Sequence, residues 1–180
     1  MNYTLSRSRR KTFVIHIKSD SSIEVRAPQR LAKSEIERFV ASKKEWIEKK
    51  QAQIITRKQT EPRELPPSQY TKGEFEQIIH ELVKNWEQRL DVETAFISMR
   101  TMTSRWGSCT AKTQRIRLNI ALAYCPFDCL EYVVVHELAH LRESNHSHRF
   151  WAIVADALPD YKERQKKLRT LSWVLAILKK

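Results

Sequence analysis

The five residues from His136 to His140, His-Glu-Leu-Ala-His, restrict what this chain can fold into more than any other stretch. Residues four apart lie on the same face of an α-helix, about 6 Å apart along its axis. If residues 133–141 are helical, His136 and His140 can bind one small cation between them. Glu137 then lies where a water bound to that cation would be. The pattern predicts a zinc site on a helix, with Glu137 as a general base.

Apolar residues around the motif support a helix. Leu130, Val134, Leu138 and Leu141 recur at helical spacing and fall on one face. On a helical wheel His136 and His140 lie at the edge of that face, with Glu137 between them and the core. A pair of ligands at the border of a buried face is what a metal site on the floor of a cleft requires.

A third metal ligand is expected after the helix. His146 stands ten residues after His136, an offset known from one group of HExxH metalloproteases. The match to that group is partial, because Glu143 replaces its turn glycine and no methionine follows the motif. His146 is the first candidate, and His148, Glu143 and Glu163 are alternatives.

Several segments of the chain resemble the YgjP-like zinc metallohydrolases, which are relatives of SprT-like metalloproteases. The segments that carry the resemblance are SRWGSC (104–109), IRLN (116–119), YVVVHELAHL (132–141) and NHSHRFW (145–151). The amino-terminal segments RRKTFVIHIK, EVRAP and ERFVASKKEWIEKK match the same family. The resemblance implies zinc at His136, His140 and His146, Glu137 as catalytic base, and peptidase chemistry. Family membership leaves the substrate open.

The first third of the chain predicts a small subdomain. Residues 11–18 and 22–28 alternate as a β-hairpin, and a helix with a capping box at Ser34 and Glu37 runs to about Gln53. Residues 60–70, with three prolines, form the predicted linker. We therefore expect an amino-terminal β-hairpin and helix subdomain at 1–59, the linker at 60–70 and a metallohydrolase domain at 71–180.

The predicted fold class is α+β, with a zincin-like catalytic domain in which a β-hairpin or small antiparallel sheet lies beside the HExxH helix. Residues 95–102 and 115–122 alternate and are expected to pair as that hairpin. Between them, Trp106-Gly107 indicates a bulge or a close backbone approach. Further helices are expected at 73–90, 148–157 and 161–171, and the apolar segment after them is expected to dock on the domain.

Cysteine usage indicates packing and not metal binding. Three cysteines, an odd number, favour a reducing compartment over a disulfide framework. Cys129 lies on the histidine side of the motif helix but seven residues before His136, about 10 Å along the axis, which is too far to share one ion with both histidines. We therefore exclude the thiols from the site.

The net charge of +12 is concentrated at the two ends of the chain. Residues 1–60 carry +9 and residues 161–180 carry +6, whereas residues 61–160 carry −3. Such basic flanks can bind nucleic acid or an acidic partner. The alternative is that these residues only form a solvated basic surface.

These features together predict a zinc-dependent hydrolase, first of all a metallopeptidase that cleaves a peptide or protein substrate with a zinc-bound water activated by Glu137. One alternative is hydrolysis of a nucleotide or another small phosphoanhydride. The other is a nucleic-acid-associated binding module that uses the basic flanks. No apolar run approaches the roughly 18 residues that span a bilayer, and no signal peptide is recognisable, so we expect a cytoplasmic protein without a membrane span.

Overall fold

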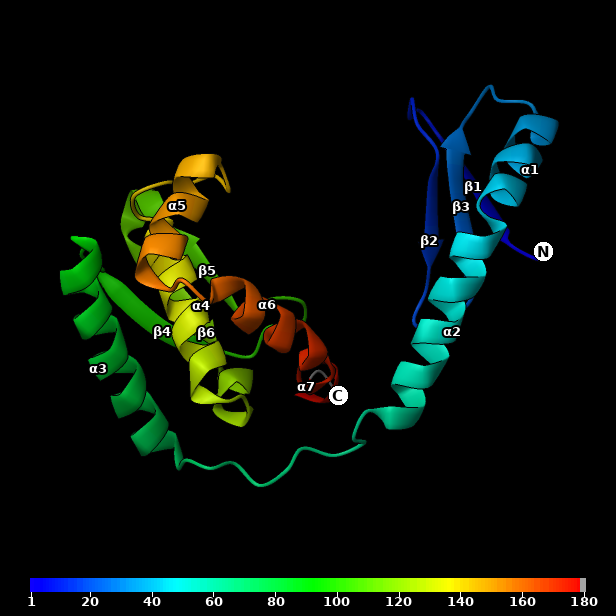
Figure 1. Cartoon of the computed structure of the whole chain (residues 1–180). Helices are drawn as coiled ribbons and strands as arrows, with labels where there is room; N and C mark the ends of the chain where they lie inside the picture. The colour runs from blue at the N-terminus through cyan, green and yellow to red at the C-terminus, as the bar shows by residue number, and fades with distance from the viewer. Residues whose placement is uncertain (179–180) are drawn as a thin grey trace. The chain divides into compact units, whose positions relative to one another are not determined.

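The computed structural model describes residues 1–178, the side chains of residues 57 and 58 excepted. The chain divides into two compact units, Met1–Glu61 and Pro62–Lys180 (Figure 1). Each unit has its own three-stranded sheet and its own hydrophobic core. The architecture is α+β, as predicted.

A sheet in the order β1-β3-β2 forms one side of the amino-terminal unit. The predicted hairpin is confirmed as β2 (Val14–Ile17) and β3 (Ile23–Pro28), which pair antiparallel. Strand β1 (Thr4–Ser8) pairs parallel to β3 and was not predicted. Its sequence, TLSRS, offers only Leu5 to the core, so it lacks the alternation by which strands are recognised.

Two helices pack on this sheet where the sequence predicted one. Helix α1 (Lys33–Ser42) is followed by α2 (Lys44–Thr60), and Lys43 between them leaves the helical conformation at φ −106° and ψ 9°. The predicted cap at Ser34 was also wrong, because the N-cap is Ala32, two residues earlier, and the helix begins at Lys33. The carboxylate of Glu35 accepts a hydrogen bond from the backbone N–H of Ala32 at 3.3 Å. The core of the unit comprises Ile23, Val25, Ala27, Ile36, Val40 and Ile47.

The sheet of the carboxy-terminal unit is mixed and has the order β4-β6-β5. Strand β6 (Arg115–Asn119) pairs parallel to β4 (Phe96–Arg100) and antiparallel to β5 (Gly107–Thr110). The prediction of an antiparallel hairpin between 95–102 and 115–122 was therefore wrong. The residues taken for its connection contain β5.

The connections explain this topology. After β4, residues 101–106 carry the chain across to the far side of β6, and Asn119 at the end of β6 holds this loop by donating to the carbonyl oxygens of Met102 and Arg105. The 3₁₀ turn η1 (Ala111–Thr113) then joins β5 to β6, with Gln114 in the left-handed region at φ 49°. The tight turn therefore lies between β5 and β6.

Helix α4 (Phe127–Ala139) lies at the centre of this unit and contacts helix α3 (Lys72–Leu90), helix α6 (Tyr161–Thr170) and strands β5 and β6 (Figure 1). This position buries most of its side chains. Those that are buried include Leu130, Val133, Val134, Val135, Leu138 and Ala139. The helix that carries the motif is therefore the least free to move.

The remaining elements follow α4. Helix α5 (His148–Ala157) confirms the predicted helix after the motif. Helix α7 (Ser172–Leu178) docks through Val174 and Leu175 on the 3₁₀ segment η2 (Ile120–Tyr124), as expected, although residues 179–180 lie outside the described part. No helix among the described residues is long and apolar enough to cross a membrane.

Candidate metal centre

Three elements position the residues of the motif. Helix α4 carries His136 and Glu137 on its last turn and ends at Ala139, so that His140 is its C-cap. A short turn then leads to Ser147, whose hydroxyl caps α5 by accepting a hydrogen bond from the backbone N–H of Phe150 at 3.3 Å. His146 directly precedes this cap. The turn is thus fixed at both ends by helices.

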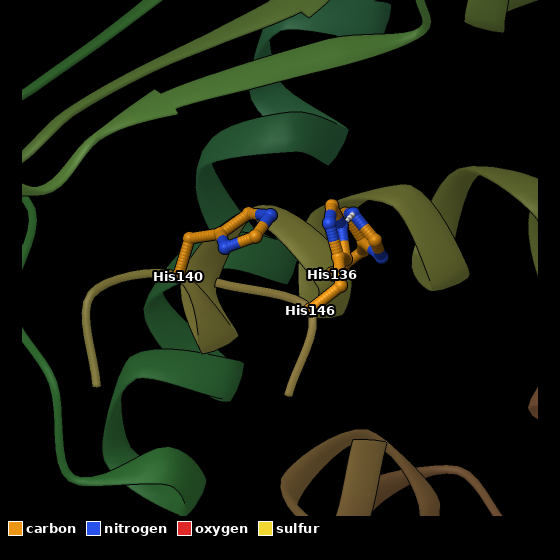
Figure 2. A group of neighbouring side chains, drawn as sticks. All are labelled: His136, His140 and His146. Carbon is orange, nitrogen blue, oxygen red and sulfur yellow. Dashed lines mark hydrogen bonds between the residues drawn. The ribbon is translucent and has the colours of Figure 1, made fainter. Parts of the chain in front are cut away.

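The imidazoles of His136, His140 and His146 converge (Figure 2). One nitrogen from each ring lies within 4.8 Å of the other two, and Nε2 of His146 is 3.0 Å from Nε2 of His136. The structure therefore brings together the three residues that the sequence singled out. His148, Glu143 and Glu163, the alternatives for the third ligand, are not in this group.

The Nδ1 atoms of His136 and His140, which lie on the same rings as the converging nitrogens, differ in their hydrogen bonding. Nδ1 of His140 lies 3.1 Å from the backbone carbonyl oxygen of Glu143, which fixes it as a donor and leaves Nε2 with a free lone pair. Nδ1 of His136 is buried and has no hydrogen-bond partner among the described residues. Glu131, which precedes His136 on α4, binds Arg164 and the indole of Trp86 and not a histidine.

Aromatic side chains of α5 support the three imidazoles from behind. The ring centroid of Phe150 lies 4.9 Å from that of His136, 4.5 Å from that of His140 and 4.8 Å from that of His146. Trp151 stacks on His146 at 5.7 Å. Phe150 and Trp151 thus pack against the His146 turn. This packing holds the rings in place without competing for their nitrogens.

The electrostatics of the cluster favour neutral imidazoles. Burial, and then the neighbouring His140 and His146, lower the pKa of His136 to about 3. Burial also lowers the pKa of His140. Neutral rings present lone pairs, and two facing Nε2 atoms with lone pairs require a cation or a shared proton between them. The donor set, three imidazoles with a carboxylate next to the first of them in the sequence, fits a divalent transition metal such as zinc.

Glu137 is one of two buried polar residues in the described part of the chain, with 6% of its surface exposed. Burial raises the pKa of its carboxyl to about 8, and the positive charge of Arg105 opposes that rise. The backbone of Gly107 on β5 lies against its side chain. The close backbone approach predicted at Trp106-Gly107 is therefore confirmed.

A cavity of about 290 Å³ opens beside His136 and Glu137. Its wall includes Tyr132, whereas His148 and Arg149 do not line it. Sequence reasoning missed Gln165 and Arg169 of α6, which also line the cavity. Nothing in the sequence links these residues to the motif about thirty positions earlier, because only the packing of α6 on α4 brings them there.

The cysteines are packing residues, as expected. Cys125 and Cys129 are buried in the core, and burial raises the pKa of their thiols to about 12 and about 11. Cys109 on β5 is half-buried, and burial, followed by the charge of Glu137, raises its pKa to about 11. Protonated thiols are poor metal ligands, and none belongs to the histidine group.

Comparison with known proteins gives a match to one family model and matches to solved structures. A family model described as "YgjP-like, metallopeptidase domain" matches residues 11–72 and 67–171. No curated protein matches the chain. The metallopeptidase zymogen abylysin of Pyrococcus abyssi is similar in structure, with 25% identity and a TM-score of 0.48 over 51% of this chain and 92% of that one. The zymogen jannalysin of Methanocaldococcus jannaschii has 24% identity and a TM-score of 0.46 over 50% of this chain and 92% of that one.

Proposed function

Since the chain belongs to the YgjP-like metallopeptidase family, we propose that it is a zinc-dependent peptidase that holds its metal with His136, His140 and His146 and uses Glu137 as general base. The observation that carries this proposal is the convergence of three imidazoles, one of which, that of His136, lines the same cavity as the buried carboxylate of Glu137. A zinc ion held by three imidazoles lowers the pKa of water and polarises a carbonyl group.

Glu137 has a pKa suited to a group that both accepts and returns a proton near neutral pH. A base works best when its pKa lies near the operating pH, and burial raises the pKa of this carboxyl to about 8. In peptide hydrolysis Glu137 takes a proton from the attacking water as the new carbon–oxygen bond forms. It then passes that proton to the nitrogen of the breaking carbon–nitrogen bond, which leaves as an amine.

Tyr132 is the residue that we propose to stabilise the tetrahedral oxyanion. Its ring centroid lies 5.8 Å from that of His136, on the cavity wall. Nε2 of Gln165 donates to its hydroxyl oxygen at 3.1 Å, so the hydroxyl hydrogen itself remains available to a substrate. A donor aimed at the developing negative charge is the usual means of stabilising such an intermediate.

We further propose that β5 binds the substrate as an added strand. In the order β4-β6-β5 it is an edge strand, and Gly107 at its start touches Glu137. An exposed edge offers backbone hydrogen bonds to an extended peptide. A test is to N-methylate single amides of a cleaved peptide, which removes one donor each. Equal kcat/KM for all such peptides would exclude strand addition.

The function itself is tested on the purified full-length protein. Elemental analysis should find zinc, and a mixed peptide library should be cleaved at internal or terminal bonds, as read by mass spectrometry. A chelator should abolish cleavage and added zinc should restore it. A protein that binds zinc but cleaves no peptide, and instead hydrolyses nucleotides, would establish the phosphoanhydride alternative.

A further inference from the structure

Two arginines line the cavity beside Glu137 and come from different elements. Arg105 lies in the loop before β5, and Arg169 lies near the carboxyl end of α6. Both side chains are exposed. The only carboxylate on the cavity wall is that of Glu137. The wall therefore carries two guanidinium groups and a single carboxyl group.

Neither arginine has an acidic partner among the described residues apart from the electrostatic attraction of Arg105 to Glu137. The nearby acidic side chains of α4 and of the start of α6 form ion pairs with two other cationic residues. Arg164 pairs with Glu131 at 2.6 Å and with Asp160 at 2.9 Å, and Lys167 pairs with Asp128 at 2.9 Å. Among the described residues, Arg169 is thus left without an acidic partner, and Arg105 has only Glu137.

Arg169 is oriented by a chain of hydrogen bonds. Its Nη2 donates to Oε1 of Gln165 at 2.9 Å, and Nε2 of Gln165 donates to the hydroxyl of Tyr132 at 3.1 Å. Tyr132 is buried at the base of this chain of hydrogen bonds. This arrangement uses one N–H of the guanidinium and leaves the others free to bind a ligand. A side chain that serves only to solubilise the surface has no need of such an anchor.

The wall also has an apolar part, in which Val133 and Leu168 are buried and Trp106 is half-buried. A volume of about 290 Å³ is at the lower end for ligand pockets, and suits one side chain or one chain end. Charge-assisted hydrogen bonds gain strength where water is excluded, and guanidinium groups match carboxylates in geometry.

We propose that this cavity binds a carboxylate of the substrate, either an acidic side chain or a free carboxy terminus, between Arg105 and Arg169. The assignment rests on the proposed function for its place in the reaction. Because Glu137 returns its proton to the leaving nitrogen, the residue that carries this nitrogen lies beside Glu137 and the cavity. The enzyme would then prefer bonds that precede an acidic residue or the last residue of a peptide.

The test measures binding without turnover. The zinc-loaded Glu137→Gln protein is titrated by calorimetry with three acetylated peptides that differ only in the last residue. These end in glutamate with an amidated terminus, glutamine with a free carboxylate, and glutamine with an amidated terminus. The first two separate the sources of the carboxylate, and the third carries none. At least one of the first two should bind about tenfold more tightly than the third.

Variants of the two arginines then show whether these residues cause the preference for peptides that carry a carboxylate. Arg105→Gln and Arg169→Gln should each reduce the preference several-fold, and this also excludes direct binding of the carboxylate to zinc as its cause. Lys166→Gln on the same helix is the matched control, because Lys166 is exposed and does not line the cavity. It should leave the preference unchanged.

The possible outcomes separate this inference from the proposed function. Equal affinity for the three peptides, no binding, or a preference that survives both arginine variants would overturn the carboxylate site. The comparison of peptides on the parent protein decides this even if a variant fails to fold. If the protein prefers peptides with a carboxylate but hydrolyses none, the proposed peptidase activity is overturned and the proposed carboxylate site stands. Peptide hydrolysis that depends on Glu137 but shows no preference for a carboxylate would support the peptidase and overturn the carboxylate site.

Discussion

Gly107 and Glu137 are in direct contact, because a Cβ atom built on Gly107 would lie 2.6 Å from Oε1 and 2.7 Å from Cγ of the glutamate. Atoms do not approach so closely, so only glycine is compatible with this position of the carboxylate. The contact joins the edge strand β5 to the last turn of α4. Strand β5 thereby limits where the side chain of the proposed base can lie.

Replacement of Gly107 by alanine should therefore displace the Glu137 carboxylate while the histidines stay in place. A shift of about 1 Å in a catalytic group costs on the order of a hundredfold in rate, and kcat/KM for a cleaved peptide should fall by about that factor. Zinc content should be unchanged. Gly73→Ala is the control, since nothing lies within 4 Å of a Cβ there. Full activity of Gly107→Ala would contradict the contact.

His146→Ala should weaken zinc binding much more than His148→Ala. His146 contributes a nitrogen to the converging group, and His148, two residues later on α5, does not. Loss of groups that merely orient a ligand costs about 10–100-fold in metal affinity, so loss of a ligand should cost at least about a hundredfold. Competition with a chromogenic chelator measures both affinities. A larger effect at His148 would reassign the third ligand.

Removal of the metal should destabilise the carboxy-terminal unit. Zinc that binds only the folded state adds about 4 kcal/mol of stability at a free concentration a thousandfold above its Kd. The histidines lie on α4 and on the turn before α5, so the gain should appear in the unfolding of residues 62–180. Calorimetry with zinc and with a chelator gives the shift in Tm. An unchanged Tm for this unit would show that the three imidazoles do not hold zinc.

Tyr132→Phe should lower kcat and leave KM largely unchanged. Removal of one oxyanion donor costs on the order of a hundredfold in kcat. The fold should tolerate the change, because the variant loses a single hydrogen bond from Gln165, worth about 1 kcal/mol. Steady-state kinetics on one peptide, with circular dichroism as a check of folding, make the comparison. A variant with unaltered kcat would remove Tyr132 from the mechanism.

The sequence was most informative about α4 and its surroundings. The spacing of His136, Glu137 and His140, together with the apolar stripe, predicted a helix, and the offset of His146 indicated the residue that the turn brings back to the pair. The Trp106-Gly107 pair indicated a close approach, although not its partner. These features are local, since each depends on residues that are near neighbours along the chain.

The topology of the second sheet could not be predicted in the same way. Strand β5 has four residues, GSCT, without apolar alternation, and its pairing with β6 depends on the crossing loop at 101–106. The cavity wall is equally non-local, because Arg105 and Arg169 meet only once α6 packs on α4. The sequence pattern within one segment does not reveal contacts between segments that are far apart along the chain.

The most direct test of the central claim compares the wild-type protein with Glu137→Gln, both carrying one zinc per chain by elemental analysis. We predict that the variant retains the metal and loses peptide hydrolysis by at least about a hundredfold, since general base catalysis contributes about 10²–10⁴-fold. Glu143→Gln, a change of the same kind on the turn outside the histidine group, should keep its activity. Peptide hydrolysis by zinc-loaded Glu137→Gln at the wild-type rate would contradict the account.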